Sequence, residues 1–330
     1  MSFRDDLLAK IKLLNDSIWD RRVSESQIDD WLATFRVGAH GTEEDRTLHA
    51  LYLLSQFMYF GHRQMRELMR VLFRDLYRYP IIEKIRRTNA NTTDMTLIGR
   101  EFRIALDRTL FLGVGNPSES GSHLLYYFRQ ENGLPKSRFI HTHEIFHRRR
   151  TSKWQLLKSM FLNWKDRFVG TLSLRDPNIN RYVFIDDFCG SGHQGKAYSE
   201  DIVEDIKSVD PSIEISYFVL CGTQAGMDVV RKNTLFDKVE CVFELDDSFR
   251  CFSPASRYFP SPVPAIVTQA FAEGMCRTYG ATIVPNAPLG YGNCQLMLAF
   301  HHNTPDNTLP VFWCDASWTP VFKRYEKFYG

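Results

Sequence analysis

The sequence predicts an α/β fold in which a parallel sheet carries helices on both faces, preceded by an N-terminal helical region. Apolar residues recur with helical spacing over residues 1–100, whereas from about residue 101 short apolar runs alternate with helical segments. Such alternation is typical of parallel sheets, because each crossover places a helix on one face. We therefore divide the chain into a helical region, 1–100, and an α/β domain with a C-terminal extension, 101–330.

The N-terminal region carries the apolar spacing and the start signals of several helices. An apolar face extends along residues 3–18, and Ser24 with Gln27 can form a capping box for the next helix. Thr42 with Asp45 offers a similar start for a third helix. These signals predict where the first helices begin.

The helix that starts at Thr42 is predicted to lead into residues 48–60, and a further helix is predicted over 64–77. Pro80 is expected to end the second, because proline has no N–H for the helical hydrogen bond. Methionine and aromatic side chains crowd these helices, and we interpret them as core packing rather than as a cofactor site.

The rest of the chain alternates apolar runs with helical patterns. Strands are predicted at 109–114, 138–145, 182–185, 213–220, 239–245 and 295–300. Helices are predicted to begin near Ser122 and to cover 153–166, 196–207, 226–233 and 264–279. The proline-rich residues 252–264 are expected to form a long ordered loop.

Composition narrows the classes of function. Lysine and arginine total 41 against 39 aspartate and glutamate, a formal net charge of +2, which gives no general case for nucleic-acid or membrane binding. No apolar run reaches membrane-spanning length, and the N-terminus lacks a signal-peptide stretch. The seven cysteines contain no Cys-x-x-Cys pair, which is typical of reduced thiols. We therefore expect a cytoplasmic protein with no membrane partner.

The most informative segment is 182–194, Tyr-Val-Phe-Ile-Asp-Asp-Phe-Cys-Gly-Ser-Gly-His-Gln. An apolar strand delivers Asp186 and Asp187, a tight loop over 190–192 follows, and a helix comes next. Glycines allow backbone N–H groups to approach phosphate oxygens, and a helix N-terminus adds positive potential. Carboxylates just before such a loop can accept hydrogen bonds from ribose hydroxyls. This order predicts a sugar-phosphate site.

The segment lacks the marks of two other phosphate-binding loops. No Gly-Lys-Ser/Thr closes the loop, and no Gly-x-Gly-x-x-Gly follows the strand, so neither a Walker loop nor a dinucleotide fingerprint is present. The competing interpretation is an ordinary strand–turn–helix corner whose two acids only cap the helix.

A second loop follows the strand predicted at 109–114. Its serines and backbone N–H groups could bind a diphosphate, although taken alone it is equally well an ordinary turn with a serine cap. Its candidate residues are Gly115, Asn116, Pro117, Ser118, Glu119, Ser120, Gly121 and Ser122. Together with 182–194, it favours the sugar-phosphate interpretation.

The segment 182–194 resembles the loop of type I phosphoribosyltransferases that binds phosphoribosyl pyrophosphate (PRPP), and the loop at 113–121 resembles their diphosphate loop. With the segments 126–129, 288–292 and 300–313, the chain is similar to the phosphoribosyltransferase-like proteins of bacterial conflict systems. Some of those proteins accompany retrons as defence effectors. The resemblance covers most of the chain and implies a type I phosphoribosyltransferase-like sheet.

The resemblance also implies a ligand and roles. Asp186 and Asp187 would be the catalytic pair, which accepts ribose hydroxyls and stabilises positive charge at C1 of the sugar. Mg²⁺ would bridge ligand oxygens, without a dedicated protein cage. The 5-phosphate of PRPP or of a related ribose phosphate or nucleotide would lie on Cys189, Gly190, Ser191, Gly192, His193 and Gln194. Partners in a defence complex, among them a retron reverse transcriptase or its DNA, are implied in the same way.

Two positions depart from the family pattern. Gly190 stands where purine phosphoribosyltransferases place an acid, and Gln194 stands where a terminal hydroxyl residue is usual. Classical purine salvage is therefore not implied. The alternative is a catalytically degenerate subunit that senses a nucleotide or serves as a scaffold in a defence complex. A nucleic-acid-binding component is a weaker third hypothesis, which the near-zero net charge disfavours.

Further candidates surround the last predicted strand. His301, His302 and Asn303 follow it and could supply a general base or contact a nucleobase, and Tyr291 lies in a glycine-containing turn on the same side. The competing interpretation is a turn fixed by its polar side chains.

The remaining polar clusters are interpreted as structural. His141, His143 and His147 have no cysteine or acid partners that would complete a metal site. The basic run at 148–150 is typical of a solvated face. Cys189 could have a lowered thiol pKa beside a helix N-terminus, although position alone assigns no nucleophile.

Overall fold

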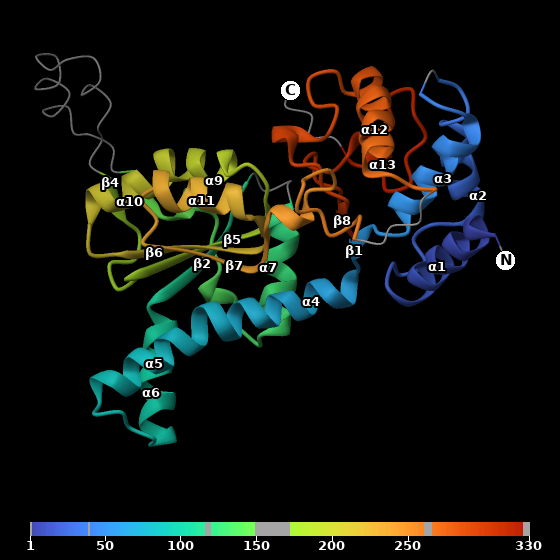
Figure 1. Ribbon diagram of the computed structural model, residues 1–330. Coiled ribbons are helices and arrows are strands. Elements are labelled where there is room, and N and C mark those ends of the chain that lie inside the picture. The colour runs from blue at the N-terminus through green and yellow to red at the C-terminus, as the bar shows by residue number, and fades with distance from the viewer. Residues whose placement is uncertain (1, 39, 116–119, 149–171, 261–265, 326–330) are drawn as a thin grey trace, which may run out of the picture. The chain divides into compact units, whose positions relative to one another are not determined.

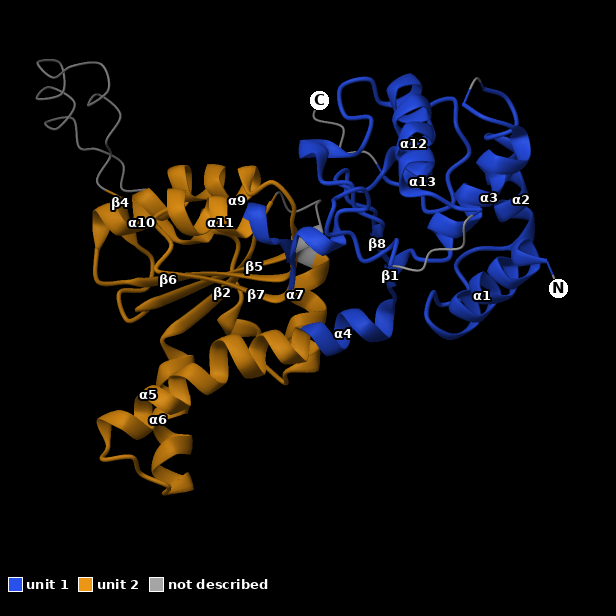
Figure 2. Ribbon diagram, in the orientation of Figure 1, with its two compact units in different colours: residues 1–68, 222–226, 244–330 blue, residues 69–221, 227–243 orange. Residues whose placement is uncertain are grey.

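The computed structural model describes residues 2–38, 40–115, 120–148, 172–260 and 266–325 (Figure 1). The chain divides into two compact units (Figure 2). Unit 1 contains Met1–Leu68, Gly222–Gly226 and Glu244–Gly330, and unit 2 contains Met69–Cys221 and Met227–Phe243. Both are discontinuous in sequence, so each end of the chain contributes to unit 1. The division at residue 100 into domains stays a prediction.

A four-stranded sheet is the centre of unit 2. Its strands lie in the order β2 (Thr109–Gly113), β5 (Arg181–Cys189), β6 (Glu214–Thr223) and β7 (Lys238–Leu245). Strands β2 and β5 pair in parallel, and helices connect β5 to β6 and β6 to β7, as in a parallel sheet. The predicted α/β fold class, with N-terminal helices before the sheet, is confirmed.

Helices cover both faces of this sheet (Figure 1). On one face lie α9 (His193–Tyr198), α10 (Glu204–Val209) and α11 (Gln224–Asn233), and on the other lies α7 (Ser120–Glu131). A π-helical segment, Ser199–Val203, joins α9 to α10. The strands are apolar runs because both of their faces are buried; β6, for example, is buried at all but its first position.

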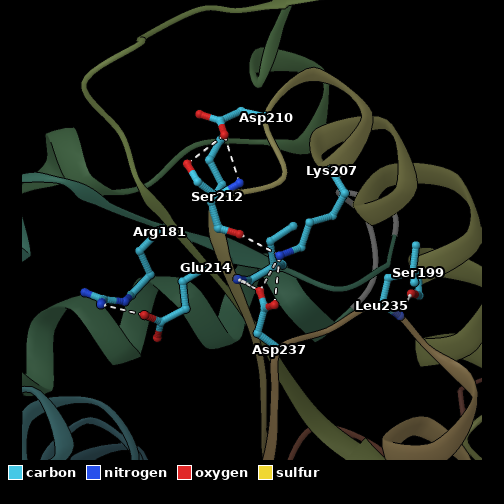
Figure 3. Close-up of polar contacts among 10 residues, drawn as sticks. Arg181, Ser199, Lys207, Asp210, Ser212, Glu214, Leu235 and Asp237 are labelled. Carbon is cyan, nitrogen blue, oxygen red and sulfur yellow. Dashed lines mark hydrogen bonds and ion pairs between the residues drawn. The ribbon is translucent and has the colours of Figure 1, made fainter.

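Polar contacts tie the sheet to α10 at the starts of its strands (Figure 3). Lys207 donates to both oxygens of Asp237 at 2.7 and 2.8 Å, and the N–H of Ile215 donates to Asp237 Oδ2 at 2.7 Å. Arg181 at the start of β5 pairs with Glu214 at the start of β6 at 2.8 Å. These contacts hold the amino-terminal edge of the strands, opposite the edge that carries the predicted loops.

Unit 1 begins with three capped helices. They are α1 (Phe3–Ser17), α2 (Glu25–Ala33) and α3 (Glu43–Leu54), and each starts with a capping box, at Ser2, Ser24 and Thr42 respectively. The starts predicted at Ser24 and Thr42 are therefore confirmed. Each box satisfies N–H groups that a helix start leaves without a partner within the helix.

The core of unit 1 joins these helices to the C-terminal part of the chain. Trp31 stacks on Phe312 with ring centroids 5.5 Å apart, and its indole N–H donates to the carbonyl of Val311 at 2.7 Å. The C-terminal helices are α12 (Gln269–Ile283) and the short α13 (Pro310–Trp313). Aromatic side chains of the N-terminal helices thus serve packing, as predicted.

The helix predicted over 48–60 is too long. It ends at Leu54, and Met58–Phe60 form strand β1, which pairs in parallel with β8 (Leu298–Phe300). The predicted strand at 295–300 is thereby reduced to three residues, and it lies in this two-stranded sheet rather than in the main sheet. Local spacing could not show this pairing, because the partner strand is far away in sequence.

Pro80 does not end its helix, contrary to the prediction. Helix α4 (His62–Val71) continues through a π-helical segment, Leu72–Arg78, into α5 (Tyr79–Thr88). A proline cannot donate to the carbonyl four residues before it, which here is that of Leu76. Lys238 donates to that carbonyl instead, at 2.9 Å. The π-helical turn and this long-range donor together accommodate the proline.

The stretch around 138–145 is not the predicted strand. It forms 3₁₀ turns at Lys136–Arg138 and Thr142–Glu144, and only Phe139 bridges β2, at Phe111. An antiparallel pair, β3 (Phe146–Arg148) and β4 (Leu172–Leu174), was not predicted. The remaining described helix is α6 (Met95–Asp107), with 3₁₀ turns at Asp247–Phe249 and Tyr291–Asn293. The predicted helix at 153–166 lies outside the described residues.

Among the residues that the structure describes, no helix combines the length and the apolarity that crossing a membrane requires.

Replacement of Asp237 by alanine should destabilise unit 2. The change removes the acceptor of Lys207 and of the Ile215 N–H. We expect a loss of about 2 kcal/mol in the free energy of unfolding, measured by urea denaturation, because charge-assisted hydrogen bonds are lost. Asp210→Ala is the matched control, since Asp210 accepts only within an exposed turn, from Ser212. Equal losses in the two variants would contradict the role given to Asp237.

Candidate functional site

Parallel pairing brings the two predicted loops to one edge of the sheet. Gly113 at the end of β2 is in register with Ile185 of β5, and the N–H of Val114 donates to the Ile185 carbonyl at 3.1 Å. Beyond the strands, the hydroxyl of Tyr198 in α9 donates to the Gly115 carbonyl at 2.7 Å. The carboxyl ends of parallel strands are where open α/β sheets bind ligands.

The loop after β5 opens a helix without a side-chain cap. Gly192 is the residue before α9, and its φ of 77° lies in the left-handed region that favours glycine. Glycine has no side chain that could cap this helix start. The interpretation that Asp186 and Asp187 only cap the helix stays a prediction. The first N–H groups of a helix have no partner within the helix, and in α9 these groups face the loop.

The other loop side chains differ in exposure. Ser191 is half-buried, with its Oγ 3.2 Å from His193 Nδ1, whereas His193 and Gln194 are exposed. Gly190 is half-buried at the position of the missing acid. The segment therefore presents glycine backbone, one hydroxyl and one imidazole, without a lysine or arginine from residue 189 to 194.

The two acids have different environments. Asp186 is buried, with 3% of its surface exposed, and Asp187 is half-buried. The hydroxyl of Tyr217 in β6 donates to Asp186 Oδ2 at 2.7 Å, and the backbone N–H of Asp187 donates to Asp186 Oδ1 at 3.0 Å. The two carboxyls also share a side-chain hydrogen bond, although they differ in burial.

Burial governs the ionisation of this pair. Burial raises the pKa of Asp186 well above its ordinary value, the charge of Asp187 raises it further, and the hydrogen bond from Tyr217 opposes the rise without cancelling it. Burial and the neighbouring Asp186 also raise the pKa of Tyr217 well above its ordinary value. The phenol therefore remains a hydrogen-bond donor.

Cys189 is not an activated thiol. Burial, followed by the charge of Asp186, raises its pKa to about 12. The lowered pKa considered from its position beside a helix start is wrong, because desolvation outweighs the helix field at a buried sulfur. Cys189 is thus part of the core below the loop.

The proposed diphosphate loop is described only at its ends. Gly115 has a φ of 100°, again in the region that favours glycine. Asn116, Pro117, Ser118 and Glu119 lie outside the described residues, and Ser120, Gly121 and Ser122 form the first turn of α7. The described residues that flank this loop are β2, Gly115 and α7.

The residues predicted for a base or an acceptor belong to unit 1. Tyr291 is exposed in a 3₁₀ turn, and the N–H of His301 extends the β1–β8 pairing by donating to the Phe60 carbonyl at 2.9 Å. Asn303 Oδ1 accepts from the N–H groups of Thr304 and Tyr325, both at 2.9 Å. The side-chain amide of Asn303 therefore holds this turn in place.

Sequence analysis missed two neighbours of His301 and His302. The His62 ring lies 4.0 Å from that of His301, and Asp20 Oδ2 accepts the His62 N–H at 2.8 Å. Gly61 permits this approach, since a Cβ there would lie 2.3 Å from Asp20 Oδ2. The available signal was that His62 follows β1 as His301 follows β8, but β1 itself was not predicted.

No metal centre emerges from the described part of the chain. His141 and His143 stack with ring centroids 5.5 Å apart, and within the described ranges no three histidine, cysteine or acidic side chains group so as to hold a metal ion.

The fold and the paired loops define a phosphoribosyltransferase-like α/β protein. A family model described as PRTase-CE matches residues 28–324, and the chain belongs to the PRTase-CE family. No curated protein matches the sequence. Among solved structures, the chain is similar to an orotate phosphoribosyltransferase from Aeropyrum pernix, with 16% identity, 46% of this chain and 77% of that chain covered, and a TM-score of 0.23. The fold class is accordingly argued from the strand order of this chain.

The Asp186→Asn variant should change how stability depends on pH. A carboxyl with a raised pKa in the folded state keeps its proton while the unfolded chain releases it, so the parent loses stability as pH rises above about 4. Asparagine removes this loss. The unfolding free energy of the variant relative to the parent should rise with pH, by at most about 1.4 kcal/mol per pH unit.

Urea denaturation at a series of pH values from mildly acidic to neutral measures this difference. Asp210→Asn provides the control, because Asp210 lies in an exposed turn where hydrogen bonds from Ser212 lower its pKa rather than raise it. If the parent and Asp186→Asn curves ran parallel, the raised pKa of Asp186 would be refuted.

Proposed function

We propose that this chain binds PRPP, or a related phosphorylated ribose or nucleotide, at the carboxyl edge of the β2–β5 pair. One observation carries the proposal: two glycine-containing loops leave adjacent parallel strands at the same edge, and one of them follows a pair of acids. A ribose phosphate with a diphosphate needs this combination, namely two anion-binding loops with hydroxyl acceptors between them.

Each part of the site then has a role. The 5-phosphate is held by the loop from Cys189 to Gln194, through its backbone N–H groups and the Ser191 hydroxyl. The diphosphate is held by the loop from Gly115 to Ser122. The two acids at the end of β5 accept hydrogen bonds from the ribose hydroxyls. The half-buried Asp187 is the acid nearer to solvent.

The proposed reaction takes place at ribose C1. The bond from C1 to the diphosphate oxygen breaks, and the diphosphate leaves with the electron pair. An acceptor, or water in a cleavage reaction, donates a lone pair to C1 and loses a proton. A carboxylate below the sugar stabilises the oxocarbenium-like charge that develops meanwhile. The acceptor is not assigned, because the candidates Tyr291, His301, His302 and Asn303 belong to unit 1.

A divalent cation, Mg²⁺, fits this site if it arrives with the ligand. The half-buried acid end of β5 is open to a ligand-borne cation, while the described residues offer no group of three ligating side chains. Diphosphate and ribose oxygens would therefore hold it, and its charge would help the diphosphate to leave.

In the cell, we propose the role of an antiphage defence effector that acts in the cytoplasm with protein partners. A retron reverse transcriptase or its DNA is among the proposed partners. A second function, a degenerate nucleotide-sensing or scaffold subunit, is favoured by one specific observation: Gly190 and Gln194 replace the acid and the hydroxyl of catalytic relatives. Both functions use the same ligand site, and they differ in turnover.

Isothermal titration with PRPP, ATP and ribose 5-phosphate, each with Mg²⁺, tests the ligand. The full chain should bind at least one of them saturably, and the Asp186→Asn/Asp187→Asn double variant should lose at least about 30-fold in affinity, because charge-assisted hydrogen bonds to the ribose disappear. Asp210→Asn, an exposed exchange of the same kind, should bind as the parent does.

Release of diphosphate from PRPP separates the two functions. An enzyme releases it with or without an added acceptor, whereas a sensor binds without release. Absence of binding by all three ligands to folded protein would refute the proposed site.

A further inference from the structure

We propose that the two acids have separate tasks: Asp187 alone meets the sugar, whereas Asp186 is a positioning residue that acts through Tyr217 on the loop after β5. This inference rests on the proposed function and assigns the parts of its site. It differs from the sequence-based expectation, in which both carboxylates accept ribose hydroxyls.

Burial distinguishes the two acids: Asp186 is buried on the core face of the strand, whereas Asp187 is half-buried. Successive residues of a strand point to opposite faces. Tyr182 and Phe184 belong to the core on one face of the sheet, where they pack with Tyr217, and Asp186 continues this alternation. The bond between Asp186 and Tyr217 confirms that the carboxyl lies on that face. Asp187 is half-buried at the end of the strand, and its carboxyl stays within hydrogen-bonding reach of Asp186.

Both oxygens of Asp186 already have protein partners. Oδ2 accepts from the Tyr217 hydroxyl at 2.7 Å, and Oδ1 accepts from the Asp187 N–H at 3.0 Å. With 3% of its surface exposed, the residue offers almost no area to a ligand. The second bond does, however, fix the peptide that carries Asp187, and so the direction of the outer carboxylate.

Tyr217 connects this acid to the loop. It is buried, and its ring stacks on Phe236 with centroids 5.3 Å apart. Its hydroxyl also interacts with the thiol of Cys189, where the loop begins. At Gly195, in the first turn of α9, a Cβ would lie 3.4 Å from the ring, which is ordinary contact. One side chain therefore touches the end of β5, the start of the loop and the start of the helix.

The groups around Asp186 favour a neutral carboxyl. Asp187 and Cys189 from its own strand and Tyr217 from β6 face it, and each of these is an acid or a weak acid. Two neighbouring carboxyls with little solvent hold one proton more readily than none. The buried member retains that proton, and the outer member carries the charge that a developing cation at C1 requires.

Titration of the full chain with PRPP and Mg²⁺ compares the single variants. Asp187→Asn should weaken binding by about 10- to 100-fold, because a charged acceptor is lost. Asp186→Asn and Tyr217→Phe should each weaken it by only about 2- to 10-fold, the range of a neutral hydrogen bond. Because they act through one bond, the Asp186→Asn/Tyr217→Phe double variant should resemble either single variant.

Infrared spectroscopy gives a readout that a merely structural role would not change. The ligand-free parent at neutral pH should show the C=O stretching band of a protonated carboxyl, and Asp186→Asn should lack that band. Asp187→Asn and Asp210→Asn are controls: Asp210→Asn should keep the band. This measurement needs no ligand and no folded Tyr217→Phe protein.

The outcomes separate the inference from the proposed function. If the parent binds none of the tested ligands, the proposed function fails, while the carboxyl band still decides the state of Asp186. If the parent binds PRPP, but Asp186→Asn loses as much affinity as Asp187→Asn and the band is absent, the division of tasks is overturned.

Discussion

The parallel pairing of β2 with β5 is the constraint on which the rest of unit 2 depends. Because the strands run in the same direction and in register from Thr109 to Gly113, both leave the sheet at one edge. The loops at Gly115 and at Gly192 are consequently neighbours, and the bond from Tyr198 to the Gly115 carbonyl joins them. Pairing in the opposite direction would send one loop to the other edge, where Lys207 and Asp237 lie.

Burial of one acid of a pair gives the site its second property. An isolated carboxylate in an apolar core is costly, so burial raises the pKa of Asp186, and hydrogen bonds engage both of its oxygens. In return, the buried acid and its tyrosine partner order their surroundings. The peptide of Asp187, the thiol of Cys189 and the first turn of α9 are all held around the Tyr217 ring. At Gly195 a Cβ would approach Val230 Cγ2 to 3.1 Å, so the absence of a side chain there favours the close packing of α9 on α11.

In unit 1, the two ends of the chain pack together into one core. Trp31 from an N-terminal helix stacks on Phe312, and β1 pairs with β8. The histidines that follow these strands, His62 and His301, come into contact for that reason. A short apolar segment such as Met58–Phe60 has no helical or strand preference of its own strong enough to reveal its partner, so it was predicted as helix.

The sequence by itself determined the α/β class, the capping boxes at Ser24 and Thr42, the strands of the main sheet and the order of acids, glycine loop and helix from 182 to 194. These features depend on the spacing of apolar, capping and glycine residues over short stretches, and the sequence shows that spacing directly. Only the tertiary structure decided which acid is buried, that Pro80 lies within a continuous helical run and that Cys189 is a core thiol. Those outcomes depend on contacts with Tyr217 and Lys238, which are distant in sequence, and on desolvation, which exists only once the chain has folded.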